Sequence, residues 1–144
     1  MIRQATKYDK TQIIEMMQLF RKESKIEQYK DLDNIEYWNK LLDSILVGQG
    51  IVYIEDNVGL ILGIVLPTIW CDKTLVMHEL AWYVKPEFRN TSVGYRLLKA
   101  YVEYGKHLKE IGRIKMFTIT KMVTSPDIKY DRFGFSKLDE NWIQ

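Results

Sequence analysis

Apolar residues recur at helical spacing near the start of the chain. Ile13, Met17 and Phe20 fall on one side of a helix if the segment after Thr6 is helical. Thr6 and Asp9 stand three residues apart, the spacing of a capping box, in which each side chain accepts a hydrogen bond from the other residue's backbone N–H. We therefore predict a first helix that begins just after Thr6 and buries one face.

Further helices follow from the same pattern. Asn34 has a side chain suited to capping a helix start, and Gly48 is placed to end that helix. The segment from Val93 to about Leu108 gives the clearest pattern, with apolar residues along one side and Lys, Arg and Glu along the other. A short last helix is predicted to open at Pro126, since proline suits a first helical turn, and to end at Gly134.

Short runs rich in β-branched and aromatic residues predict strands between these helices. Two of the runs flank the turn residues Glu55-Asp56-Asn57 and predict a hairpin. Other strands are predicted over residues 2–6, 74–84 and 113–120, with a last strand over 135–143.

The predicted elements follow one another in the order β-α-α-β-β-β-α-β-α-β. Hairpins in the first half require antiparallel strands, whereas the strand–helix–strand crossover over residues 74–120 requires a parallel pair. A chain of 144 residues is expected to form one domain around one core. We therefore predict an α/β fold of mixed, α+β character: a single domain over residues 1–144 with a central mixed sheet flanked by helices.

Composition narrows the class of protein without indicating a function. Hydrophobic residues make up 47% of the chain and charged residues 28%, which fits a globular protein and argues against disorder. The formal net charge of +2 is too small to indicate a nucleic-acid or membrane partner. The N-terminus lacks the apolar core of a signal peptide, and no apolar run approaches the roughly 18 residues of a membrane span. We expect a cytoplasmic protein.

Cysteine and histidine are scarce. Cys71 has no second cysteine to form a disulfide with, which fits a reducing compartment, and we expect a partly buried structural thiol there. His78, His107 and Cys71 do not have the spacing of metal ligands, so no metal is expected.

The connection between the strand at 74–84 and the helix at Val93 is rich in small polar residues. This stretch, VKPEFRNTSVGYRLL, carries no acidic residue after Glu87. The first N–H groups of a helix have no partner within the helix, and together with the helix dipole they attract anions. We therefore predict an anion-binding site at this helix start.

This loop and the order of elements resemble the GNAT superfamily of N-acetyltransferases. The family motif is Arg or Gln, two residues of any kind, Gly, any residue, then Gly or Ala, and residues 89–94 occupy that frame. The lead-in V-x-P-x-x-R begins at Val84, and the stretch YDRFGF at 130–135 is similar to the family's late Y-x-x-x-G-F motif. The resemblance covers nearly the whole chain in element order and these two places in motif.

The resemblance implies that acetyl-coenzyme A is the co-substrate and that the bound anion is its pyrophosphate. The loop main chain would hold the pyrophosphate with help from Arg89, and Val84 would offer main-chain hydrogen bonds to the pantetheine arm. At position 92 the family most often has Gly, so the Cβ of Ser92 narrows the approach of a phosphate, although its hydroxyl can bond a phosphate oxygen. The cofactor-binding residues implied in this way are Val84, Arg89, Asn90, Thr91, Ser92, Val93, Gly94 and Tyr95.

Acetyl transfer to an amine needs a base, and the strand at 74–84 offers two. His78 and Glu79 are adjacent in the strand, so they face opposite sides and only one can face the cleft. The family often places a Glu near this position. We favour Glu79 because Ala81 and Tyr83 would share its face and leave room for a substrate, whereas His78 would share its face with core residues; the choice between the two stays open.

Tyr130 is the second predicted catalytic residue. In the resembling family, a Tyr at this place points its hydroxyl at the thioester sulfur, where it can return a proton to the departing thiolate. Catalysis would then rest on Glu79 as the base and Tyr130 as the acid.

The favoured interpretation is an N-acetyltransferase that moves an acetyl group from acetyl-coenzyme A to a primary amine by direct transfer in a ternary complex. The acceptor would be a small molecule or a peptide, and its identity, acyl chains other than acetyl and a homodimer stay open. The alternative is a catalytically weak or inactive GNAT-like module that binds acyl-coenzyme A and acts through a protein partner, which Ser92 keeps open. Nucleic-acid binding is not favoured, because the basic residues are dispersed among acidic ones.

Overall fold

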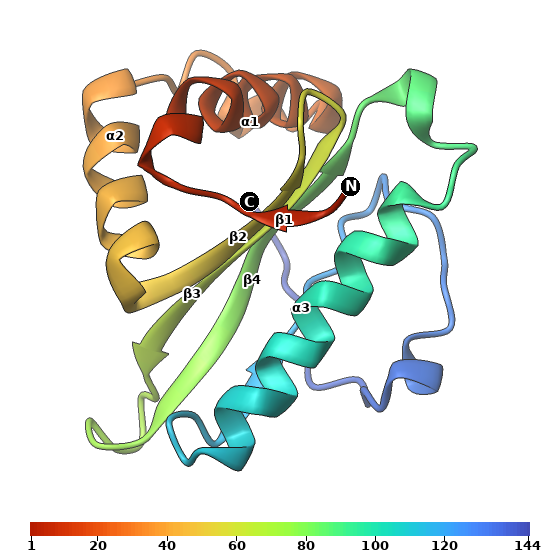
Figure 1. Cartoon of the computed structure of the whole chain (residues 1–144). Coiled ribbons are helices and arrows are strands. Elements are labelled where there is room, and N and C mark those ends of the chain that lie inside the picture. Colours follow the sequence, from red (N-terminus) through yellow and green to blue (C-terminus); the bar gives the residue numbers. More distant parts are fainter.

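A five-stranded sheet forms the middle layer of the computed structural model, which describes residues 1–144 (Figure 1). The strands lie side by side in the order β1-β2-β3-β4-β5. The first four pair antiparallel, and β5 pairs parallel to β4, which confirms the predicted mixed sheet. Their bounds are Arg3–Gln4, Gly50–Glu55, Gly59–Pro67, Leu75–Val84 and Met116–Thr118.

Three helices cover the two faces of this sheet. Helices α1 (Lys10–Ser24) and α2 (Ile35–Ser44) lie on one face, and α3 (Val93–Glu110) lies on the other (Figure 1). The Asn34 side chain accepts a hydrogen bond from the Tyr37 N–H, which confirms the predicted cap of α2. A π-helical turn, Ile45–Gln49, continues α2, and Gly48 takes a φ of +123° there, a conformation that favours glycine.

The start of the first helical segment is held by the predicted capping box. Thr6 and Asp9 exchange backbone-to-side-chain bonds around the 3₁₀ turn Lys7–Asp9, which leads directly into α1. Arg3 donates to both carboxylate oxygens of Asp9, at 2.7 and 2.9 Å. This arginine, with the Thr6 N–H, holds the pKa of the Asp9 carboxyl well below its usual range. The local sequence pattern therefore predicts this helix start correctly.

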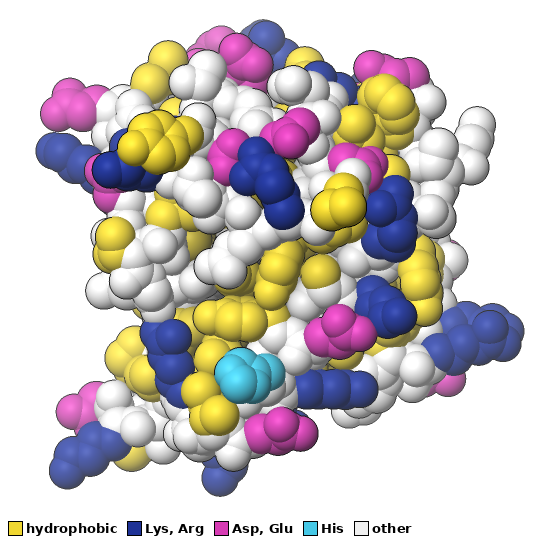
Figure 2. All heavy atoms as spheres, in the orientation of Figure 1, with side chains coloured by type: hydrophobic (Ala, Val, Ile, Leu, Met, Phe, Trp, Pro, Cys, Tyr) yellow, Lys and Arg dark blue, Asp and Glu magenta, His cyan; other side chains and the backbone are white.

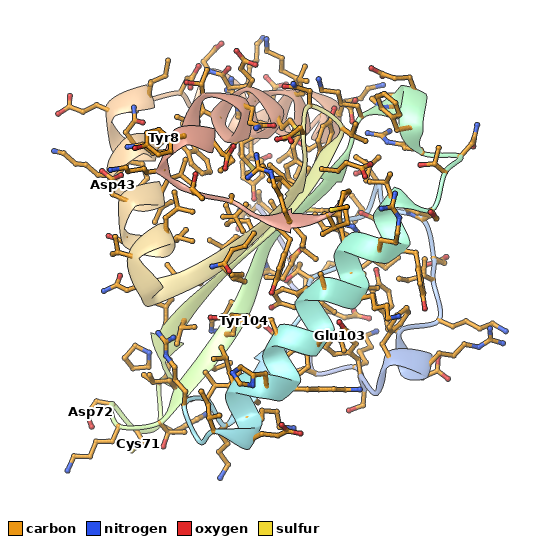
Figure 3. The ribbon with its side chains drawn as sticks, viewed as in Figure 1. Tyr8, Asp43, Cys71, Asp72, Glu103 and Tyr104 are labelled. Atoms are coloured by element: carbon orange, nitrogen blue, oxygen red, sulfur yellow. The ribbon has the colours of Figure 1, made fainter.

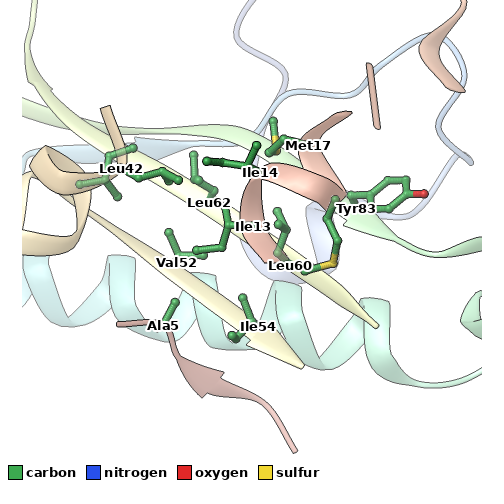
Figure 4. Packing of buried hydrophobic residues seen from close by; sticks show 13 residues of the cluster. Ala5, Ile13, Ile14, Met17, Leu42, Val52, Ile54, Leu60, Leu62 and Tyr83 are labelled. Carbon is green, nitrogen blue, oxygen red and sulfur yellow. The ribbon is translucent and has the colours of Figure 1, made fainter. Parts of the chain in front are cut away.

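Each face of the sheet carries its own hydrophobic core. The α1/α2-side cluster joins the buried faces of those helices to β2, β3 and β4; Figure 4 shows Ile13, Leu42, Val52, Leu60 and Tyr83 packed within it. The α3-side cluster contains the buried residues of α3 and of the opposite sheet face, and among its members are Ile61, Met77, Leu97 and Tyr101.

Two glycines let α3 pack close to the sheet. A Cβ added to Gly63 in β3 would lie 2.8 Å from the ring of Tyr101, and one added to Gly105 in α3 would lie 2.6 Å from the ring of Phe117 in β5. No side chain fits at such distances, so both positions require glycine. The close approach fixes α3 against β3 and β5, on either side of β4.

The C-terminal part of the chain differs from the sequence prediction. No helix opens at Pro126; the chain instead forms a 3₁₀ turn at Tyr130–Phe133, which Gly134 ends with a φ of +88°. Residues 135–143 form no strand. A strand needs a neighbour to pair with, and β5 has only three residues, so the outer edge of the sheet offers too little backbone. None of the helices has the length and apolar character required to cross a membrane.

Candidate active site

The strands β4 and β5 separate partway along β4. They pair only from Val76, opposite Met116, to His78, opposite Thr118. Beyond that point β5 ends, while β4 continues to Val84 with a sheet neighbour on the β3 side alone. An open strand edge exposes backbone groups that can bind an extended ligand.

The pairing of β3 with β4 slips by one residue beside this opening. Leu62 lies opposite Ala81 and Gly63 lies opposite Glu79, so Leu80 has no partner and forms a β-bulge. Strict alternation of side chains along β4 is therefore interrupted at Leu80.

The bulge decides which way Glu79 faces. Its cross-strand partner Gly63 lies against the Tyr101 ring, so Glu79 is on the α3 side of the sheet. Ala81 and Tyr83 belong to the α1/α2-side cluster on the other side. The expectation that these two residues share a face with Glu79 is wrong, because it assumed an unbroken two-residue period.

His78 lies on the opposite face from Glu79. It pairs with Ile64, whose side chain packs against the α1/α2-side cluster, and its Nδ1 lies 3.3 Å from the Thr118 hydroxyl oxygen. The two candidate bases thus face different sides, and Glu79 is the one that lines a small cleft at the end of the β4–β5 opening.

Glu79 is a buried carboxyl in this cleft, with 7% of its surface exposed and no ion-pair partner. Burial raises the pKa of Glu79 from its ordinary 4.5 to about 8, and a hydrogen bond with the Thr120 backbone offsets only part of the rise. An ionised carboxylate with such a pKa is a far better proton acceptor than an exposed one. Buried carboxyls of this kind are concentrated at functional sites.

Tyr130 approaches Glu79 from the C-terminal turn. Burial raises the pKa of the Tyr130 hydroxyl, and the charges of Glu79 and Asp127 raise it further. The Tyr101 hydroxyl, which donates to the Thr118 carbonyl at 2.7 Å, has its pKa raised by burial and by Glu79 as well. The fold therefore brings both predicted catalytic residues into one neighbourhood, although they come from β4 and from a turn near the C-terminus.

The loop before α3 presents several backbone N–H groups without a protein partner. The N–H groups of Asn90, Ser92, Gly94 and Tyr95 have no hydrogen-bond acceptor in the protein. The Thr91 N–H is bonded to the Phe88 carbonyl. Unpaired N–H groups at a helix start form a binding site for an anion.

Gly94 leaves space in front of these N–H groups. A Cβ added there would meet only the Val84 and Trp82 side chains, at 3.7 and 3.8 Å, which is ordinary contact. Packing within the protein therefore does not demand glycine at this position. The open space fits a ligand that approaches the backbone closely.

Arg89 is already engaged by the protein. Its Nε donates to the Val84 carbonyl at 2.8 Å, its terminal nitrogen pairs with Glu23 of α1, and its guanidinium lies 5.5 Å from the centre of the Tyr83 ring. The predicted help of Arg89 in holding a pyrophosphate would require it to leave Glu23. The Val84 carbonyl already accepts this one hydrogen bond and retains a second lone pair.

Ser92 takes an ordinary backbone conformation, with a φ of −81°. A glycine is therefore not required there by the backbone. The Ser92 hydroxyl accepts a hydrogen bond from Arg96 at 3.2 Å, and Arg96 also lies 3.4 Å from Glu55.

The C-terminal turn packs against the beginning of α3. In the first turn of that helix, the centre of the Tyr95 ring lies 5.9 Å from the centre of the Phe133 ring.

A larger groove opens on the α1/α2 side of the sheet. Phe20 lines both this groove and the cleft that contains Glu79. The walls of this groove come from separate segments that meet only in the fold, so the sequence alone did not predict it. The other lining residues are Met17, Gln18, Arg21, Tyr29, Asp31, Leu32, Asp33, Asn34, Tyr37 and Trp38.

Other candidate chemistry lies elsewhere or is absent. Cys71 is an exposed thiol at the tip of the β3–β4 hairpin (Figure 3), so the expected partial burial is wrong. No group of three His, Cys, Asp or Glu side chains is placed to hold a metal ion. Basic and acidic side chains are interspersed over the face drawn in Figure 2, which shows no continuous basic patch for a nucleic acid.

Comparison with known proteins identifies the family. The family model for GNAT acetyltransferases matches residues 11–135, which include the β4–β5 opening, the loop before α3 and the C-terminal turn. The chain belongs to the GNAT acetyltransferase family. No curated protein matches the sequence significantly.

Solved structures of GNAT acetyltransferases share the fold. A predicted acetyltransferase from Clostridium acetobutylicum, solved with acetyl-coenzyme A, is 16% identical, with a TM-score of 0.74 over 100% of this chain and 94% of that one. Glucosamine-6-phosphate N-acetyltransferase from Arabidopsis thaliana is 14% identical, with a TM-score of 0.68 over 100% and 96%. An aminoglycoside acetyltransferase from an uncultured soil metagenomic sample is 14% identical, with a TM-score of 0.66 over 100% and 95%.

Proposed function

We propose that this protein transfers the acetyl group of acetyl-coenzyme A to a primary amine by direct transfer in a ternary complex. The observation that carries the proposal is the buried carboxyl of Glu79 in the cleft at the end of the β4–β5 opening, with the Tyr130 hydroxyl near enough for the charge of Glu79 to act on it. The unpaired N–H groups of Asn90, Ser92, Gly94 and Tyr95 support a pyrophosphate site at the other end of the opening. Anion site, open strand edge and buried acid–base pair follow one another along β4.

Glu79 would act as the base of the reaction. Its carboxylate takes a proton from the acceptor amine, whose nitrogen forms the new bond to the acetyl carbonyl carbon. Because burial raises the pKa of Glu79 to about 8, it lies closer to the pKa of an alkylamine, about 10.4, than an exposed carboxyl would. The proton transfer is correspondingly less unfavourable.

Tyr130 would complete the reaction as the acid. When the carbon–sulfur bond breaks, the thiolate of coenzyme A leaves, and the Tyr130 hydroxyl donates a proton to the sulfur. Its raised pKa keeps the phenol protonated at neutral pH. The proton that Glu79 removes from the amine and the one that Tyr130 supplies to the sulfur balance each other.

The acceptor would lie in the groove that meets the cleft at Phe20. Tyr29, Tyr37 and Trp38 offer aromatic faces, and Asp31 and Asp33 offer carboxylates. Such a lining suits a polar amine with further hydroxyl or ammonium groups, which carboxylates bind and aromatic rings pack against. The names of the aminoglycoside and glucosamine-6-phosphate acetyltransferases indicate acceptors of this class, so aminosugars come first among the candidates, with peptides second.

The proposal is tested in two steps. Calorimetry with acetyl-coenzyme A measures binding, and a thiol-release assay over a panel of aminosugars, polyamines and peptides measures transfer. We expect binding and amine-dependent thiol release, with mass spectrometry showing an acetylated product. If the protein binds acetyl-coenzyme A but no amine causes thiol release, the proposed transferase activity is contradicted. The alternative, a module that binds acyl-coenzyme A without catalysis, is then favoured.

A further inference from the structure

Trp82 holds the one buried side-chain nitrogen or oxygen atom that lacks a hydrogen-bond partner. This atom is the indole Nε1. Folded proteins pair almost all buried polar groups, because an unpaired donor loses its bond to water and gains nothing in return. An exception calls for an explanation, and a ligand that supplies the missing acceptor is one.

The position of Trp82 points to such a ligand. It lies in the part of β4 that has no β5 neighbour, and its Cζ2 would be 3.8 Å from a Cβ at Gly94. Trp82 also lines the cleft that contains Glu79 and Phe20. The unpaired donor thus lies between the start of α3 and the buried carboxyl, along the path that the pantetheine arm would follow.

We propose that the Trp82 indole N–H donates a hydrogen bond to a carbonyl oxygen of the acyl-pantetheine arm. This inference rests on the proposed function. An indole nitrogen can only donate, so it cannot recognise an ammonium group, and a neutral amine needs its lone pair for the attack. The thioester and amide carbonyls of the arm are hydrogen-bond acceptors. The position of Trp82 beside Gly94, on the part of β4 without a β5 neighbour, places it on the acyl-coenzyme A side of the site.

The side of the cleft formed by residues 120–125 is held by few backbone hydrogen bonds. Thr120, Met122 and Ser125 line the same cleft and come from a segment without helix or strand. Within residues 119–129 the only backbone hydrogen bond with both partners in the segment runs from the Ser125 N–H to the Met122 carbonyl. Few bonds must break for this wall to shift, so an arm entering the cleft can reach the indole.

Nuclear magnetic resonance of the indole N–H groups tests the inference directly. The chain has four tryptophans, Trp38, Trp70, Trp82 and Trp142, and the Trp82→Phe variant assigns the Trp82 signal by its loss. If that variant does not fold, a variant with the other three tryptophans replaced by Phe leaves Trp82 as the only signal. We expect the Trp82 N–H proton to move downfield when wild-type protein is saturated with acetyl-coenzyme A. A shift with coenzyme A as well assigns an amide carbonyl, and a shift with acetyl-coenzyme A alone assigns the thioester.

Affinity gives a second measurement. By calorimetry, Trp82→Phe should bind acetyl-coenzyme A about tenfold more weakly, while Trp70→Phe, at an 88% exposed site on the hairpin tip, should bind as wild type does. An unshifted Trp82 signal at saturation, or Trp82→Phe affinity within twofold of wild type, overturns the inference and leaves the proposed function intact. Wild-type protein that does not bind acetyl-coenzyme A overturns both.

Discussion

Glu79 lies close enough to the Tyr130 hydroxyl for its charge to raise the pKa of that phenol, beyond the rise caused by burial. The two side chains come from β4 and from the 3₁₀ turn Tyr130–Phe133, and their neighbourhood depends on the packing of that turn against α3 through Phe133 and Tyr95. The fold therefore places the proposed base and the proposed acid within electrostatic reach of each other.

Tyr130→Phe should lower turnover about 100-fold, the low end for general acid catalysis, and leave acetyl-coenzyme A affinity within a few-fold of wild type. The ring and its packing remain, and only the hydroxyl is lost. Steady-state kinetics and calorimetry measure the two effects. Tyr104→Phe, which removes a hydroxyl from the Tyr53–Tyr104 pair elsewhere on α3, is the matched control (Figure 3). Turnover within threefold of wild type would leave Tyr130 with a packing role.

Glu79→Gln should lower turnover and remove the acidic limb of the rate–pH profile. In the wild type, the rate should rise with pH through about 8, because Glu79 must be ionised to accept a proton. The exposed Glu103 on α3 provides the control, since Glu103→Gln removes a carboxylate without touching the cleft (Figure 3). An unchanged acidic limb in Glu79→Gln would mean that another group is the base.

The stability of the protein should also depend on Glu79. Its folded-state pKa of about 8 lies above the ordinary 4.5, so between these values the folded state holds a proton that the unfolded state has released. The free energy of unfolding should then fall as pH rises from about 5 to 8, by at most about 1.4 kcal/mol per pH unit from this group. Urea unfolding of wild type and Glu79→Gln across this range measures the difference. Parallel curves for the two proteins would contradict the raised pKa.

Gly94→Glu should abolish acetyl-coenzyme A binding without unfolding the protein. A Cβ at this position meets its neighbours at ordinary distances, so the fold should tolerate the change, while a carboxylate beside the unpaired N–H groups repels the pyrophosphate. Gly94→Ala adds the Cβ alone and should keep measurable affinity by calorimetry. If Gly94→Glu binds acetyl-coenzyme A with wild-type affinity, the pyrophosphate does not bind at this loop.

Ser92→Gly should bind acetyl-coenzyme A as well as wild type or better. The substitution removes the Cβ beside the phosphate path and frees Arg96 from its 3.2 Å hydrogen bond with the Ser92 hydroxyl. Calorimetry at two salt concentrations would show whether the freed arginine contributes charge. A tenfold loss of affinity, about 1.4 kcal/mol, would instead show that the hydroxyl contacts the ligand.

Features set by neighbouring residues were predictable from the sequence. The capping box at Thr6 and Asp9, the Asn34 cap, the turn after Glu55 and the start of α3 depend on side chains within a few positions of the backbone groups that they serve. Local hydrogen bonds fix these features whatever lies elsewhere in the chain. The loop before α3 was found for the same reason.

Features set by contacts distant in sequence were not predictable. The bulge at Leu80 depends on how β4 registers with β3, and the pairing of Arg89 with Glu23 depends on where α1 ends. The last predicted strand failed because it assumed a pairing edge that the short β5 does not provide. The acceptor groove has walls from three segments, and no single stretch of sequence contains its pattern.

The bulge at Leu80 divides β4 into two halves that should respond differently to substitution. In the half before Leu80, odd-numbered positions such as Met77 and Glu79 face α3; in the half after it, the even-numbered Trp82 and Val84 do. In a substitution scan along β4, the loss of stability from changes on the α3 side should therefore fall at odd-numbered positions before Leu80 and at even-numbered positions after it. Deleting Leu80 would join Glu79 directly to Ala81 and restore an unbroken alternation with both halves on their present faces, so the extra residue is not needed to place either half and serves instead to bend β4 where β5 leaves it.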